Sequence, residues 1–67
     1  MVSVFDVLEE WLGEDGSRAV EVQHGGRGGR WYVLLKEGSG MDWTWDGTGE
    51  TLEGAVGSAL ESAGLIR

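Results

Sequence analysis

Acidic side chains in residues 42–53 have the spacing of a calcium-binding loop. The carboxylates of such a loop alternate along the chain and converge on one ion, and a glutamate at its last position gives two oxygens. Four acids and a central glycine occupy matching positions here: Asp42, Asp46, Gly47, Glu50 and Glu53. A strand, an Asp-Gly turn and a capped helix explain the same residues without an ion. We therefore expect no metal or other cofactor, and a calcium-binding module remains an alternative function.

A glycine-rich segment, HGGRGGRW at residues 24–31, brings two arginines together. Arginines in such segments can stack on RNA bases, usually in long disordered arrays, whereas this chain has one copy. A phosphate-binding loop is disfavoured because its glycine and lysine spacing is missing and the segment leads into a strand. The segment therefore predicts a hairpin loop. Arg27 and Arg30 are candidate contacts to a partner, and an RNA-contacting domain remains a second alternative.

His24 is the only histidine, and the chain has no cysteine. General acid–base catalysis and nucleophilic catalysis need a positioned partner and a pocket. The spacing places no nucleophile with a supporting acid beside His24, and a chain of 67 residues buries only a small core. The sequence therefore predicts a protein that is not an enzyme, with a single domain over residues 1–67.

Charge and hydropathy limit the class of partner. The formal net charge is −7, and residues 1–16 and 37–61 hold acids but no base. A negative field of this kind repels nucleic acids and anionic membranes and attracts a basic protein. No apolar run is long enough for a membrane helix or a signal peptide. The sequence therefore predicts a cytoplasmic protein without a membrane partner.

The amino-terminal residues have the pattern of an amphipathic helix. Ser3 and Asp6 have the spacing of a capping box, and apolar residues then recur every three or four positions as far as position 12. Glu9 and Glu10 lie on the polar side. The pattern predicts a helix over residues 4–12 that the glycines at positions 13 and 16 bring to an end.

Three segments alternate apolar and polar residues as strands do, over residues 20–23, 31–36 and 41–46. A three-residue hairpin loop at positions 38–40 predicts that Leu35 faces Trp43 and that Val33 faces Trp45. One face of the sheet then holds Trp31, Trp43 and Trp45, which we expect to be core residues. The valines of the first strand join that face if the first hairpin encloses an even number of residues.

Residues 51–63 have the pattern of a second helix, with Thr51 as its cap and Gly64 at its end. The expected order is therefore α-β-β-β-α. It predicts a two-layer α+β domain, in which both helices cover the tryptophan face of a three-stranded antiparallel meander.

This order resembles the topology of double-stranded-RNA-binding domains. Those domains carry basic residues at the start of their last helix, where this chain has Glu50 and Glu53. Residues 31–63 resemble the strand, strand, helix part of HicB-type antitoxins. In those antitoxins a glycine, a capping threonine and an alanine-rich helix follow two strands, as do Gly49, Thr51, Ala55 and Ala59 here. The resemblance implies a protein that sequesters a small toxin and often oligomerises.

Together these patterns predict a small, acidic, non-enzymatic protein-binding module, such as an inhibitor or an antitoxin-like regulator, that binds a basic partner. Tyr32 and Leu34 form an apolar pair on the sheet face that no predicted helix covers. Two copies could bury this pair in a self-complementary patch, which predicts a homodimer. The candidate contact residues are Tyr32, Leu34, Glu9, Glu10, Arg27 and Arg30. Nucleic acid is not an expected partner.

Overall fold

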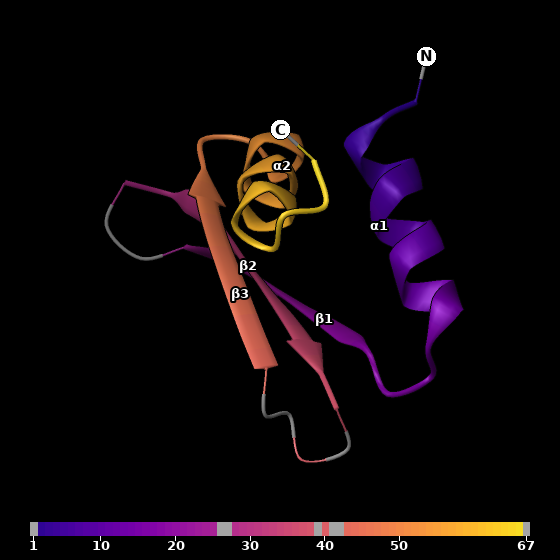
Figure 1. The fold of residues 1–67 in the computed structure, drawn as a ribbon. Helices are drawn as coiled ribbons and strands as arrows, with labels where there is room; N and C mark the ends of the chain where they lie inside the picture. The colour runs from indigo at the N-terminus through magenta and orange to yellow at the C-terminus, as the bar shows by residue number, and fades with distance from the viewer. Residues whose placement is uncertain (1, 26–27, 39, 41–42, 67) are drawn as a thin grey trace.

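The computed structural model describes residues 2–25, 28–38, 40 and 43–66. Within them two helices flank three strands in the order predicted, and the strands form one antiparallel sheet with β2 at its centre (Figure 1). This arrangement confirms the α-β-β-β-α order and the α+β class. The elements are α1 (Val4–Glu14), β1 (Ala19–Gly25), β2 (Arg30–Glu37), β3 (Trp43–Gly49) and α2 (Leu52–Ser62).

Side-chain caps begin both helices where the sequence predicts them. The Ser3 hydroxyl accepts from the backbone of Asp6, whose carboxylate accepts from the backbone of Ser3, so the capping box is complete. The Thr51 side chain accepts from the backbone of Gly54 at 3.0 Å. At the end of α2, Gly64 has a φ of 75°, and the backbone N–H of the next residue reaches back to the Leu60 carbonyl.

The end of α1 differs from the prediction. The helix continues through position 13 to Glu14, and its C-cap is Asp15 rather than a glycine. The Asp15 carboxylate accepts from both the backbone N–H and the hydroxyl of Ser17, at 2.9 and 2.8 Å. Aspartate favours turns through such local bonds, so a side chain, and not backbone freedom, directs the chain from α1 toward β1.

The first hairpin encloses an even number of residues, as predicted. Gly25 pairs with Arg30, which leaves residues 26–29 between them, and His24 pairs with Trp31. Val20 and Val22 therefore lie opposite Leu35 and Val33, on the tryptophan side of the sheet.

The second hairpin is shifted by two residues from the predicted pairing. Leu35 faces Trp45, and Trp43 faces Glu37, because residues 38–42 all lie between the paired ends of β2 and β3. An even shift leaves every side chain on its predicted face. It moves Trp43 to the end of the sheet, however, where its side chain is 64% exposed. The prediction that Trp43 is a core residue is wrong.

Two glycines bring α2 against β3. Gly47 lies inside β3 and is buried, so the prediction of an Asp-Gly turn at this point is also wrong. A Cβ atom at Gly47 would collide with the backbone of Ala59, and one at Gly49 would lie 2.7 Å from the backbone nitrogen of Ala55. A strand glycine often marks such a close approach of another backbone.

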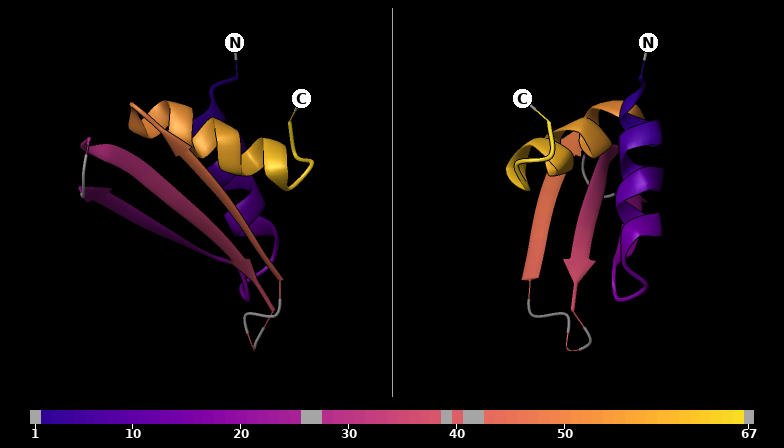
Figure 2. Two further views of the ribbon diagram at one scale, coloured as in Figure 1. Left: turned by 90° about the vertical axis from the view of Figure 1, so that its left-hand side faces the viewer. Right: turned by 45° about the vertical axis from the view of Figure 1, so that its right-hand side comes forward.

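The core lies between the helices and one face of the sheet. Val33 and Leu35 of β2 are fully buried, and Trp11 of α1 and four residues of α2 complete the buried core. The α2 helix packs on β3 and β2, and α1 packs beside α2 (Figure 2). In Figure 1, β1 begins close to the end of α1 and runs to the opposite side of the molecule, where it meets the start of β2. Among the described residues, neither helix has the length and hydropathy needed to cross a membrane.

Candidate functional site

A groove of about 230 Å³ lies between α1 and the segment that follows α2. Four of its residues come from one stripe of α1, at the i, i+3, i+4 and i+7 spacing that places side chains on one helix face. Leu65 comes from the segment after α2. We call this feature the acidic groove; its lining residues are Val7, Glu10, Trp11, Glu14 and Leu65.

The acidic groove combines apolar surface with two carboxylates. Glu10 is exposed, and among the described residues no base pairs with it. Glu14 is 58% exposed and pairs with Arg18 at 3.0 Å. Glu9 is also exposed on α1, but it does not line the groove. Such a surface suits a lysine or arginine, whose apolar stem and charged head need different surroundings.

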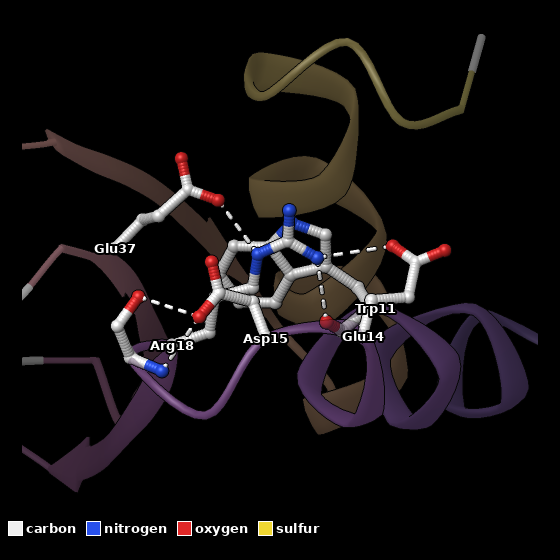
Figure 3. A network of polar contacts seen from close by, with 6 residues as sticks. Trp11, Glu14, Asp15, Arg18 and Glu37 are labelled. Atoms are coloured by element: carbon white, nitrogen blue, oxygen red, sulfur yellow. Dashed lines mark hydrogen bonds and ion pairs between the residues drawn. The ribbon is translucent and has the colours of Figure 1, made fainter.

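Arg18 lies beside the groove at the centre of a polar cluster that joins three parts of the chain (Figure 3). Its Nε atom donates to the Glu37 carboxylate of β2 at 2.6 Å. Its Nη1 atom donates to the Trp11 carbonyl at 2.8 Å and to Glu14 at 3.0 Å. The guanidinium carbon lies 4.8 Å from the centre of the Trp11 ring. We call Trp11, Glu14, Arg18 and Glu37 the Arg18 cluster.

The electrostatics of the Arg18 cluster favour a fixed cation. The hydrogen bond with Glu37 raises the pKa of Arg18 above its ordinary value, the bond with Glu14 acts in the same direction, and burial opposes both. The sequence patterns assign Arg18 no role. A weak signal was present, since α1 has no base in its last turn and Arg18 is the first base after it.

The open face of the sheet brings Tyr32 and Leu34 together on β2, as predicted. Both are half-buried, and Leu34 faces Glu21 on one side and Asp46 on the other. The Tyr32 hydroxyl donates to Asp46 at 3.2 Å, and Lys36 pairs with Glu21 at 3.0 Å. Partial burial and the bond to Asp46 raise the pKa of Tyr32, while Lys36 lowers the pKa of Glu21.

Arg30 lies at the end of the β1–β2 hairpin. It borders a depression of about 250 Å³ that is also lined by Tyr32, Gln23, His24 and Gly25. Arg30 and Tyr32 lie two residues apart in β2, so the alternation of the strand places both on the same face of the sheet. The His24 and Trp31 rings lie 4.3 Å apart at a tilt of 41°. Arg27, the other arginine of the glycine-rich segment, lies outside the described residues.

The calcium candidates are distributed over two elements. Asp46 lies in β3, where its carboxylate accepts from Tyr32, and Glu53 lies in the first turn of α2. Glu50 lies between them, and Asp42 is outside the described residues. Within the described part of the chain, no three acidic or histidine side chains gather as metal ligands would.

Comparisons with known proteins leave this geometry as the basis for assigning a function. No protein-family model matches the chain, and neither a curated protein nor a solved structure matches it. The resemblance to HicB-type antitoxins and to double-stranded-RNA-binding domains therefore stays a prediction from the sequence.

Proposed function

We propose that this domain is a non-enzymatic protein-binding module that recognises a basic segment of a partner protein. The observation that carries the proposal is the acidic groove, in which Glu10 and Glu14 lie beside the apolar residues Val7, Trp11 and Leu65. The net charge of −7 supports it, because a field of this sign draws a basic partner toward the surface.

The chemistry of the groove indicates how a basic segment would bind. Val7 and Leu65 offer apolar contact to the methylene stem of a lysine or arginine, and Glu10 offers a carboxylate to its head. An exposed ion pair contributes little by itself. Affinity would therefore depend on the stem contacts and on neighbouring residues of the partner, while the carboxylates would favour cations and speed encounter.

A regulator that sequesters a basic protein is the biological role that this proposal favours. Such a role is that of an inhibitor or an antitoxin-like protein, and it requires no catalytic group or cofactor. The acids that would meet the partner are Glu10 in the groove and Glu9, the preceding residue of α1, both of which are exposed. The cytoplasmic location stays a prediction from the sequence.

A titration with a hexa-lysine peptide, followed in ¹H–¹⁵N spectra, tests the proposal. We expect shifts to concentrate at Val7, Glu10, Glu14 and the Trp11 indole. Glu10→Gln should weaken binding by roughly two- to fivefold, the range expected for an exposed ion pair. Glu53→Gln is the matched control, because it removes the same charge from an exposed residue of α2. Equal losses in the two variants would show general charge attraction and contradict a groove-specific site.

A further inference from the structure

The Arg18 cluster has the features of a binding site for a guanidinium group. Its ligands come from different segments, since Trp11 and Glu14 belong to α1 and Glu37 belongs to β2. The group that fills it, the Arg18 guanidinium, belongs to the connection between α1 and β1. The Arg18 side chain is only 18% exposed, so most of it is shielded from solvent.

The geometry is selective for a planar group. Glu37 accepts from Nε, while the Trp11 carbonyl and Glu14 share Nη1, so acceptors approach the guanidinium in two directions. The Trp11 ring lies beneath it at 4.8 Å. A guanidinium presents donors in a rigid plane and stacks on aromatic rings, whereas an ammonium is a compact point charge. The cluster is therefore built for arginine rather than lysine.

The cluster is connected to the acidic groove through Glu14 and Trp11, which belong to both. Arg18 itself lies outside the regular elements, in the connection between Glu14 and Ala19. Its side chain can therefore leave the cluster without breaking a helix or strand. An arginine arriving in the groove would reach Glu14 first, because that carboxylate is mostly exposed.

We propose that the Arg18 cluster is a guanidinium-binding site, which an arginine of the partner protein enters by displacing Arg18. The exchange replaces one guanidinium by another, so both carboxylates keep a cation and the Trp11 carbonyl keeps a donor. Arg18 thus competes with the partner, and only a partner that makes further contacts in the groove displaces it. The displacement rests on the proposed function, whereas the guanidinium site does not.

The site is tested with Arg18→Ala and ethylguanidinium chloride as the probe. We expect the melting temperature of the variant to rise by roughly 3–6 °C at three times the dissociation constant, since a ligand that binds only the folded state stabilises it by mass action. Ethylammonium chloride and sodium chloride at equal ionic strength should not raise the melting temperature of Arg18→Ala. The parent should show no rise, because Arg18 fills its site.

The test also applies if Arg18→Ala does not fold in the absence of a ligand. Ethylguanidinium, and not ethylammonium, must then restore the circular dichroism of the folded chain. No guanidinium-specific gain in either the melting temperature or folding would overturn the site.

Displacement is tested by calorimetry with hexa-arginine and hexa-lysine peptides. Arg18→Ala should bind hexa-arginine at least tenfold more tightly than the parent does, and hexa-lysine less than threefold more tightly. Lys36→Ala is the control for net charge, because it removes the base of a different ion pair. Equal hexa-arginine affinities in the parent and Arg18→Ala would refute competition by Arg18. If Glu10→Gln bound hexa-lysine as tightly as the parent does, only the proposed function would be refuted.

Discussion

The outer surface of α1 and the open face of the sheet both carry acids, but their charges are balanced differently. On the sheet face, Glu21 pairs with Lys36, and Asp46 accepts from the Tyr32 hydroxyl. On α1, Glu9 and Glu10 have no base beside them within the described residues. The bond from the neutral hydroxyl leaves Asp46 charged, but it gives this carboxylate a hydrogen-bond partner on the sheet face, whereas Glu9 and Glu10 have no cation to balance them. The position of unpaired acids, rather than their number, indicates where a basic partner would bind.

Replacing Trp11, which attaches α1 to the core, is expected to cause the largest loss of stability. Trp11 is 5% exposed, and its ring packs edge-on against that of Trp45, with ring centres 6.3 Å apart. Trp11→Ala should lower the free energy of unfolding by about 3–5 kcal/mol in a urea titration. Trp43→Ala should lower it by less than about 1 kcal/mol, because Trp43 is mostly exposed. Similar losses would mean that Trp43 belongs to the core.

The next effect concerns association through the sheet face. We expect a homodimer, because Tyr32 and Leu34 form a half-buried apolar pair on this face and Lys36 pairs with the neighbouring Glu21. Sedimentation equilibrium at about 0.15 M salt, where long-range repulsion is screened, should show dimers at high micromolar concentration. Tyr32→Ser/Leu34→Ser should be monomeric, and Glu9→Gln/Glu10→Gln should remain dimeric. A monomeric parent would refute the homodimer.

A smaller effect is expected from alkaline pH on the same face. The pKa of Tyr32 lies above its ordinary value of 10.0, so the fold favours the protonated hydroxyl. Its contribution to stability is present below pH 10 and is lost as the pH rises through the raised pKa. Melting temperatures measured from about pH 8 to 11 should therefore fall less in Tyr32→Phe than in the parent. Parallel curves would contradict the raised pKa of Tyr32, which partial burial and the bond to Asp46 cause together.

The smallest effect is expected from calcium. Asp46 is bonded to Tyr32 and Glu53 lies in α2, so the two carboxylates have separate environments. Melting temperatures in calcium and in EDTA should agree. A rise that grows with calcium and disappears in Glu53→Gln would instead support the calcium-binding alternative, since an ion that binds only the folded state must stabilise it.

Alternation in the sequence predicts the faces of the strands but not their register. Val33 and Leu35 are buried and Leu34 faces away from them, as the period of two requires. The partner of each residue depends on the loop, and the glycines near position 38 fit more than one loop length. An Asp-Gly pair such as Asp46-Gly47 is common in turns. Here Gly47 lies inside β3, where the close approach of α2 leaves no room for a side chain.

The Arg18 cluster could not be predicted because its contacts are not local. Arg18 meets Glu14 four positions away, the Trp11 carbonyl seven positions away and Glu37 nineteen positions away. Only the first separation corresponds to a familiar sequence pattern. The acidic groove was half predictable, since the helical period places Glu10 and Glu14 on one stripe with Val7 and Trp11. The position of Leu65 depends on how α2 packs, which no local pattern specifies.

The glycines of β3 also define a way to recognise relatives of this chain. At positions 47 and 49 a side chain of any size would push α2 off the sheet, whereas a Cβ atom at Gly13 or Gly16 meets nothing within 4 Å. The contact between β3 and α2 therefore restricts substitution at these two positions far more than at Gly13 or Gly16. A tryptophan followed by two alternate glycines, and then by two alanines spaced four apart, is the pattern we expect to persist: Trp45, Gly47, Gly49, Ala55 and Ala59.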